Sequence, residues 1–532
     1  MMALLRKHWL ALLPVATFVA VTAPFMTTPP IWDGYQYFSC LLNATGGRFV
    51  MEKFLCYGHP SLLYMMLFGT TQYLAYGSVA AVNVLSIALG AGSILAFYAC
   101  TLFLFPRSRA LAALITALYA LHPVFVGNVV NFNADMGIVI FFIFLLWALL
   151  YDVTWAAVLS GFFLCFTKET GVALYVMTVV AYVLLFITRG EGTLRQRLNR
   201  LRILIFLVFP ALEFFLYFFF RAGVQNTSPM WIGATSTREI VAGLLDINVA
   251  DARWLMTLAE IFLMNFAWIP SAIVLTAASV YLLRFAFRLS HPPLTTLVHG
   301  KGMLLVIVLA VFGLHLLTTF NLYHNPRYWM PVFSLNALLF AAALHYLVPR
   351  ETVRIAVASG VVAFSVLAIF RSVDPVSRAL FGMFPFGSHA LYALAPATRD
   401  HCCGYGRDQI VYNLEYMRLA VLQDYAHRRI QPTGNSIIVI HPNAGLGFGG
   451  AVDPVSFRRV FASPWIKPLY MNTPTFLALR VLPETIFFIE YPYVNNAGGI
   501  AALRKIYPST HEWDVRSGGY TLKVLEMSRR RK

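Results

Sequence analysis

Residues 131–150 read NFNADMGIVIFFIFLLWALL, and this stretch indicates the fold more strongly than any other. The apolar run approaches the roughly 20 residues that a helix needs to cross a bilayer. Asp135 directly precedes the run, and Asn128, Asn131 and Asn133 lie just before it. Polar groups at the mouth of an apolar helix are costly unless they are used. They indicate either a binding site that contains Asp135 or a polar cap on the helix.

The composition of the whole chain is that of a membrane protein. Hydrophobic residues make up 59% of the 532 positions and charged residues 12%, whereas a soluble domain carries about 25% charge. The formal net charge is +17, but there is no basic stripe with motifs of the RNA- or DNA-binding type. We therefore exclude nucleic acid as a partner and assign the positive charge to loops in contact with anionic membrane lipids.

Apolar runs recur along the first 371 residues, which we predict to form one transmembrane module. The expected fold class is a polytopic all-α membrane protein with about eleven transmembrane helices. A first outside loop covers 27–78, and its stretch 60–76 is short and amphipathic enough to be an interfacial helix. The predicted spans are 9–26, 79–105, 109–126, 136–151, 154–167, 170–188, 203–222, 258–286, 302–320, 330–348 and 353–371.

The distribution of Lys and Arg predicts the orientation of these spans. Alternate connections hold 14 and seven basic residues, as expected when the richer set faces the cytoplasm. The N-terminus is then cytoplasmic, and an odd number of spans places the C-terminal segment outside. The short loops favour the inner (plasma) membrane of a bacterium.

The pattern changes near residue 385. The segments 435–440 (NSIIVI), 484–490 (ETIFFIE) and 519–525 (GYTLKVL) have the composition of short β-strands bounded by turn residues. Apolar residues at helical spacing predict a helix over 408–428. We therefore predict an extracytoplasmic α/β domain over residues 385–532.

Asp33 is the first candidate for catalysis. It lies at the end of the first span in the segment 31–38, IWDGYQYF. A carboxylate beside aromatic rings can act as a general base toward an acceptor hydroxyl, and the rings suit the apolar face of a sugar. The alternative is a helix-end carboxylate among interfacial aromatic residues.

Two cations fall in connections on the same predicted face as Asp33 and Asp135. Lys168, in the segment FTKETG, can attract a phosphate, or it can pair with Glu169 or extend to the headgroups. Arg327 and Tyr328, in the segment NLYHNPRYWMP, suit phosphate binding because Arg contacts phosphate in a bidentate manner. An interfacial anchor is the alternative for this pair.

The order of these segments resembles the GT-C class of glycosyltransferases. More narrowly, it is similar to the superfamily of dolichyl-phosphate-mannose-protein mannosyltransferases and lipid A aminoarabinose transferases. The resemblance covers about residues 1–371 and departs from the family pattern at Gly34, where many members carry a second acidic residue. The matching motifs are Asp33, His59-Pro60-Ser61, Asp135, Thr167-Lys168 and Arg327-Tyr328 followed by Pro331.

The resemblance implies an inverting transfer of a sugar from a polyprenyl-phosphate donor on the outer face of the membrane. The acceptor would be a hydroxyl of a lipid, a glycan or a protein. Asp33 would be the base, Asp135 and His59 would contribute to the acceptor site, and the donor phosphate would bind Lys168, Arg327 and Tyr328. We expect no required cofactor, and a divalent metal between Asp33 and Asp135 stays open.

A secondary transporter is the alternative function. Glu213, Glu260 and His315 lie within or near predicted spans, as transport residues would. However, there is no internal repeat, and the strongest charges gather at one predicted surface. Cys40 and Cys56 share the first outside loop, where they form either a disulfide or two unpaired thiols.

Overall fold

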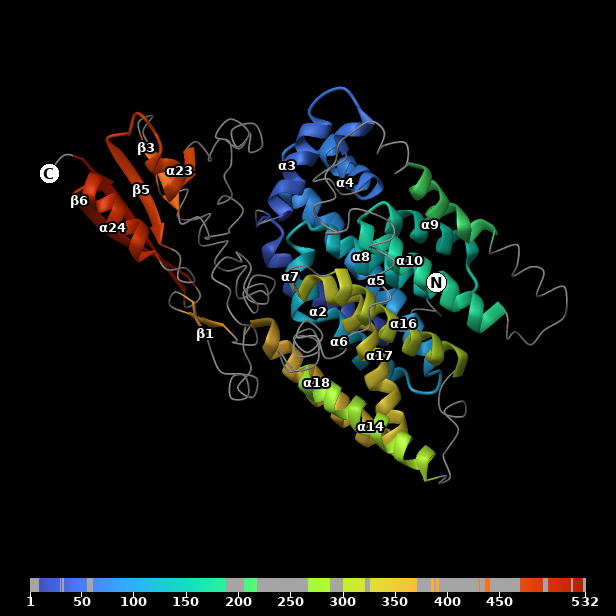
Figure 1. Ribbon diagram of the computed structural model, residues 1–532. Coiled ribbons are helices and arrows are strands. Elements are labelled where there is room, and N and C mark those ends of the chain that lie inside the picture. Colours follow the sequence, from blue (N-terminus) through green and yellow to red (C-terminus); the bar gives the residue numbers. More distant parts are fainter. Residues whose placement is uncertain are drawn as a thin grey trace.

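The chain, as a computed structural model, forms a bundle of helices followed by a small sheet near the C-terminus (Figure 1). The structure describes residues 9–28, 30, 33–54, 61–187, 205–217, 267–287, 300–320, 326–370, 384–386, 389–391, 430, 436–440, 469–490, 496–517 and 520–529.

The helices of the bundle follow the apolar runs of the sequence. Each predicted span overlaps a described helix, and α4 lies where the interfacial helix was expected. In chain order the labelled helices are η1 (Trp9–Ala11), α2 (Leu12–Thr22), η2 (Ala23–Phe25), α3 (Asp33–Thr45), η3 (Met51–Phe54), α4 (Leu62–Leu74), α5 (Val79–Leu104), α6 (Arg109–Ala120), α7 (Pro123–Val129), α8 (Ala134–Leu150), α9 (Thr154–Cys165), α10 (Glu169–Tyr182), η4 (Val183–Ile187), α14 (Trp268–Ala286), α16 (Gly300–Phe320), η5 (Pro326–Trp329), α17 (Met330–Leu347) and α18 (Glu351–Phe370).

Three of the described helices are long and apolar enough to cross a membrane by themselves: Val79–Leu104, Trp268–Ala286 and Arg327–Leu347. Six further apolar helices, including Ile205–Tyr217, have 10–17 residues in the described part of the chain. The mostly helical fold is therefore confirmed, and the count of eleven spans stays a prediction.

The predicted span 109–126 differs from the structure, because the chain bends by 59° between α6 and α7. His122 is extended, with φ −62° and ψ 127°, and Pro123 begins α7. Proline disfavours helical geometry in the residue before it and has no N–H for the preceding turn. The break turns α7 away from the axis of α6 and leads the chain into the start of α8.

Helix α8 lies at the centre of the bundle. It is buried along its whole length except at Phe144 and Trp147, and it contacts α5, α9, α10 and α17. A helix that is apolar on every side is stable only where neighbours or lipid surround it. The apolar stretch 134–150 is thus the helix around which the bundle packs.

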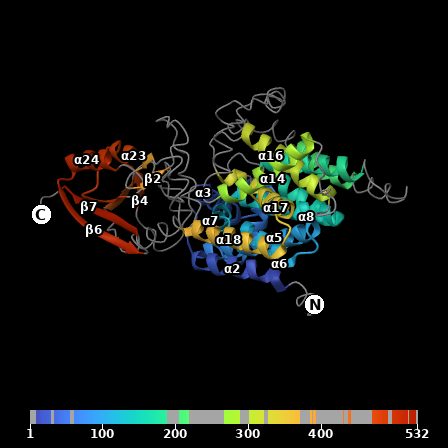
Figure 2. The ribbon, with the colours of Figure 1, turned by 90° about the horizontal axis from the view of Figure 1, so that it is seen from below.

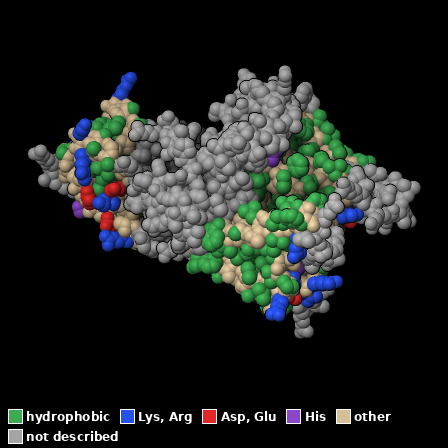
Figure 3. Space-filling model, turned by 60° about the horizontal axis from the view of Figure 1, so that its bottom comes forward, with side chains coloured by type: hydrophobic (Ala, Val, Ile, Leu, Met, Phe, Trp, Pro, Cys, Tyr) green, Lys and Arg blue, Asp and Glu red, His purple; other side chains and the backbone are tan. Residues whose placement is uncertain are grey.

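Apolar side chains cover much of the described outer surface of the bundle (Figure 3). Leu282 and Phe285 on α14 are 62% and 67% exposed, and Val311 on α16 is 61% exposed. Lys and Arg side chains gather toward the lower edge of the bundle in the same view. Exposed apolar surface of this extent is unfavourable in water, so the chain is an integral membrane protein.

The sheet near the C-terminus has five strands in the order β4-β3-β5-β7-β6. Strand β3 is parallel to β4 and β5, whereas β7 is antiparallel to β5 and β6. Helices α23 and α24 lie on one side of it (Figure 2), where Phe476 and Leu503 pack against Phe488. The bounds are β3 (Ser436–Ile440), β4 (Leu469–Asn472), α23 (Thr473–Leu477), β5 (Thr485–Glu490), α24 (Ala497–Ile506), β6 (Ser509–Ser517) and β7 (Tyr520–Ser528); β1 (Phe384–Phe386) and β2 (His389–Leu391) form a separate pair.

The three strands expected from the sequence correspond to β3, β5 and β7, whereas β4 and β6 were missed. Strand β6 contains the charged sequence STHEWDVRS, which lacks a continuous apolar core. The helix expected over 408–428 lies outside the described residues. The domain division at residues 371 and 385 stays a prediction.

One cysteine of the predicted first outside loop, residues 27–78, is paired. Cys40 is disulfide-bonded, while Cys100 and Cys165 are free and buried. Because Cys56 lies outside the described residues, its pairing with Cys40 stays a prediction.

Candidate functional site

Three charged side chains that are distant in the sequence meet at one point, and we call them the charged cluster: Asp135, Lys168 and Arg327. Lys168 Nζ donates a hydrogen bond of 2.8 Å to Asp135 Oδ1. Arg327 Nε lies 3.0 Å from Asp135 Oδ2. Asp135 is in the first turn of α8, Lys168 precedes α10, and Arg327 is in η5 before α17. Each carboxylate oxygen of Asp135 therefore contacts one cation.

The charged cluster is buried. The side chains of Asp135, Lys168 and Arg327 expose 5%, 10% and 6% of their surface. Burial has the largest single effect and lowers the pKa of Lys168, but the charge and hydrogen bond of Asp135 together with Tyr328 raise that pKa above its ordinary value. The three side chains carry two positive charges and one negative charge. A Lys and an Arg that are buried side by side suit a phosphate group as ligand.

Tyr328 covers both cations of the cluster with its ring. Lys168 Nζ lies 4.1 Å and Arg327 Cζ 5.1 Å from the ring centroid. Arg327 Nη2 also donates to Tyr328 Oη over 3.3 Å. Cation–π contacts of this kind restrain the cations without neutralising them. The phenol is thus in a position to order the two cations around a ligand.

The start of α8 explains how Asp135 is presented. Asn133 is the N-cap, and its Oδ1 accepts a hydrogen bond of 2.9 Å from the backbone N of Asp135. A carboxylate in the first turn also interacts favourably with the helix dipole. The sequence allowed either a binding site that contains Asp135 or a polar cap on the helix. In the structure Asn133 is the cap, so the Asp135 side chain is available to contact the two cations.

Asp33 and His59 are placed less completely. Asp33 is the first residue of α3, but its side chain lies outside the described residues, as does all of His59. The next residue, Gly34, packs directly on the loop before α8, because a Cβ there would lie 1.9 Å from the backbone O of Asn131. The start of α3 therefore lies beside the loop that leads to Asp135.

A divalent metal does not fit the surroundings of Asp135. Both oxygens of its carboxylate contact cationic groups within 3.0 Å, and a metal ion at the same oxygens would be repelled by them. Among the residues that the structure describes, no three His, Cys, Asp or Glu side chains are grouped as metal ligands. We derive no step through a metal.

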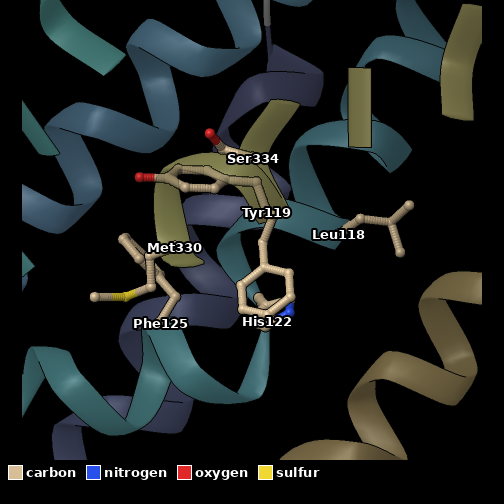
Figure 4. Close-up of a pocket in the computed structure, with 7 residues that line it drawn as sticks. Leu118, Tyr119, His122, Phe125, Met330 and Ser334 are labelled. Carbon is tan, nitrogen blue, oxygen red and sulfur yellow. The ribbon is translucent and has the colours of Figure 1, made fainter. Parts of the chain in front are cut away.

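A small cavity lies between α6, α7 and α17, and none of the three charged side chains lines it. Tyr119, His122, Phe125, Met330 and Ser334 surround it (Figure 4). The His122 ring stacks on Phe333 with centroids 4.3 Å apart. The cavity is mostly aromatic and aliphatic, and it is separate from the charged cluster.

The sequence pattern indicates no role for Phe132 and Tyr64 beyond their aromatic character, or for Asn131 beyond its polarity. Tyr64, on α4, donates a hydrogen bond of 2.8 Å to the backbone O of Asn133. Phe132 has a positive φ of 43°. An aromatic residue between two asparagines was the one visible signal, but neither a left-handed backbone nor a contact over 69 residues can be seen in sequence.

Comparison by sequence finds no matching family model and no matching curated protein. Among solved structures, the chain is similar to ArnT from Cupriavidus metallidurans in the apo state, with a TM-score of 0.46, 15% identity and coverage of 96% of this chain and 97% of that chain. It is also similar to ArnT from the same organism bound to undecaprenyl phosphate, with a TM-score of 0.49, 14% identity and coverage of 97% of both chains.

Similarity at this level assigns no role to any residue of this chain.

Proposed function

We propose that this chain is a membrane glycosyltransferase that moves a sugar from a polyprenyl-phosphate donor to an acceptor hydroxyl, with inversion. The observation that carries the proposal is the buried charged cluster, in which Lys168 and Arg327 meet at Asp135. In this proposal the N-terminus is cytoplasmic, and the reaction takes place on the outer face of a bacterial inner membrane. The transmembrane module is 1–371, and an extracytoplasmic domain is 385–532.

The cations of the cluster suit the charge of the donor. A lipid-linked sugar phosphate is a phosphodiester with one negative charge, which Lys168 and Arg327 can bind. When the sugar leaves, the phosphate becomes a monoester and acquires a second negative charge near neutral pH. Arg327 and Lys168 stabilise this developing charge because they are held in place before the reaction. The site thus stabilises the charge on the leaving phosphate more strongly than water does.

The reaction needs a base and an attack opposite the phosphate. The Asp33 carboxylate accepts the proton of the acceptor hydroxyl, and the hydroxyl oxygen forms a bond to the anomeric carbon. The bond from this carbon to the phosphate oxygen breaks, and its electron pair stays on the phosphate. The configuration at the anomeric carbon inverts. No co-reactant is required.

Asp135 orients the two cations in this scheme. A carboxylate has about four acceptor positions, so two remain for the acceptor hydroxyl after both ion pairs form. Asn133 Nδ2 is buried without a hydrogen-bond partner in the part of the chain that the structure describes, which suits donation to a sugar hydroxyl. His59 completes the proposed acceptor site, and Tyr328 holds the cations.

A secondary transporter is the second candidate, because a buried charged cluster between helices also suits ion or solute binding. The other residues that were considered for transport do not belong to the charged cluster. Glu213 is exposed on Ile205–Tyr217, His315 is partly buried on α16, and Glu260 lies outside the described residues. The two functions differ in whether a covalent bond is broken.

The test uses the full chain in nanodiscs with a panel of radiolabelled polyprenyl-phosphate sugars and membrane extract. Undecaprenyl phosphate is the first carrier to use. Wild type is expected to transfer the label, whereas Asp33→Asn and Arg327→Ala lose transfer. Arg516→Ala is the matched control, because that Arg side chain is 74% exposed on β6.

The outcomes separate the candidates. Loss of transfer in both site variants, with Arg516→Ala unchanged, supports the glycosyltransferase. Full transfer by Asp33→Asn removes Asp33 as the base. If wild type neither binds nor turns over any carrier, while reconstituted vesicles accumulate a solute, the transporter replaces the glycosyltransferase.

A further inference from the structure

Phe132 adopts a backbone conformation that aromatic residues rarely accept. Its φ is 43°, in the left-handed region where the Cβ of an L residue approaches the following carbonyl. Its side chain is 1% exposed. A residue persists in such a conformation only where its surroundings over-determine it, and these cases gather at functional sites.

The surroundings are three aromatic rings from the first outside loop, which we call the aromatic clamp: Tyr37, Tyr64 and Phe68. The Phe132 ring stacks on Tyr64 at 5.9 Å between centroids and 13° between planes. It lies 4.7 Å from Phe68 and 6.5 Å from Tyr37. The clamp residues belong to α3 and α4, which lie beside each other at one end of the bundle (Figure 1).

A hydrogen bond and a close approach fix the clamp to the start of α8. Tyr64 Oη donates to the backbone O of Asn133 over 2.8 Å. Gly137, one turn into α8, allows the Tyr64 ring to approach, since a Cβ there would lie 2.7 Å from Tyr64 Cε2. Tyr64 therefore holds the turn on both sides of Asn133, and Phe68 holds it at Phe132.

The same turn leads directly into the charged cluster. Asn133 Oδ1 accepts a hydrogen bond from the backbone N–H of Asp135, and the Asp135 carboxylate contacts Lys168 and Arg327. A rotation of the backbone at Phe132 into a common conformation would move Asn133 and the first turn of α8. Buried ion pairs depend strongly on geometry, so a small displacement would separate Asp135 from one of its cations.

We propose that Phe132 is a positioning residue: gripped by the aromatic clamp, it holds the left-handed turn that places the Asp135 carboxylate between Lys168 and Arg327. The inference rests on the proposed function only for what the charged cluster binds. The first outside loop and the cluster are thereby linked through one side chain. Phe132 itself contacts neither donor nor acceptor.

The first test is a double-mutant cycle on thermal unfolding of the detergent-purified full chain, with no ligand. Phe132→Leu and Asp135→Asn are made singly and together. Phe97→Leu is the matched control, because Phe97 is buried to the same degree and stacks on Tyr119 at 4.6 Å. Coupled neighbours give non-additive effects, and independent sites give additive ones.

We expect Phe132→Leu to lower the Tm clearly in wild type and much less in the Asp135→Asn background. Phe97→Leu should lower it equally in both backgrounds. Additive effects for both phenylalanines would overturn the proposal, since Phe132 would then be an ordinary core residue. Should Phe132→Leu fail to fold, Tyr64→Phe replaces it in the cycle, because this change removes only the hydroxyl.

The second test measures equilibrium binding of undecaprenyl phosphate. Phe132→Leu is expected to weaken it about tenfold, within the range found for coupled neighbours, and Phe97→Leu to leave it unchanged. Equal weakening by both variants contradicts the proposal. If wild type does not bind this carrier, the proposed donor is wrong, while the cycle on Tm still decides the role of Phe132.

Discussion

Two groups of charged residues in this chain use the same residue types in opposite environments. In the charged cluster, Asp135 lies between Lys168 and Arg327 with side chains that are 5–10% exposed. On the sheet, Glu512 lies 3.2 Å from Arg504 and 3.6 Å from Lys523, with side chains that are 43–54% exposed. In both groups one carboxylate lies between two cations.

The difference shows that the same set of charged residue types does not by itself form a binding site. Water and salt screen the charges of the group on the sheet, and exposed ion pairs contribute about 0–1 kcal/mol. The side chains of the charged cluster are largely removed from water, so their charges interact more strongly with one another and with a bound anion. Burial therefore turns a common surface arrangement into a candidate phosphate site.

The largest expected effect is that of Asp135→Asn on stability. It leaves two buried cations without their shared carboxylate, and breaking a buried ion pair costs about 3–5 kcal/mol. Glu512→Gln, its counterpart on the sheet, should cost less than about 1 kcal/mol. Denaturant unfolding of both variants in detergent measures the two losses. Similar losses would show that burial does not distinguish the two groups.

Gly34→Ala is expected to have the next largest effect, on transfer. The new Cβ would lie 1.9 Å from the backbone O of Asn131, so α3 or the loop before α8 must shift. A displacement of about 1 Å at reacting groups can reduce the rate on the order of a hundredfold. Gly360→Ala on α18 is the matched control, because a Cβ added there would have no atom within 4 Å. The transfer rate and the Tm of both variants are measured. Normal transfer by Gly34→Ala would mean that the contact between Gly34 and Asn131 does not position Asp33, the proposed base.

Tyr328→Phe should have a smaller effect on donor binding. It removes the oxygen that accepts from Arg327 Nη2 at 3.3 Å and keeps the ring over Lys168. One hydrogen bond of ordinary net strength corresponds to a change of about two- to tenfold. Tyr328→Ala, which also removes the ring, should weaken carrier binding further. If the two variants bind equally, the ring contributes nothing to holding the cations.

The smallest expected effect is that of pH. The pKa of Lys168 is raised above its ordinary value of 10.5. Its contribution to stability is therefore fully present below that value and is lost only as the pH rises through the higher pKa of the folded state. The free energy of unfolding should therefore change by the same amount between pH 7 and pH 9 in wild type and in Lys168→Met. A drop over this interval that disappears in Lys168→Met would mean that Lys168 titrates near neutrality.

Much of the helical architecture could be predicted, because the requirement behind it is local. A span shows as a run of apolar residues whatever its neighbours are, and each predicted run overlaps a described helix. The bend at Pro123 was missed because His122 and Pro123 interrupt an otherwise apolar stretch for only two residues. Strand β6 was missed because its charged side chains are exposed at the edge of the sheet.

The sequence by itself determined which chemical groups are present and that Asp135, Lys168 and Arg327 lie in connections between apolar runs. Only the tertiary structure decided that Asp135 contacts both cations at once and that Asn133, not Asp135, caps α8. Only it placed Phe132 in a left-handed turn held by rings from α3 and α4. The reason is physical: hydropathy depends on each residue alone, whereas ion pairing and backbone strain depend on distances between segments that the fold brings together.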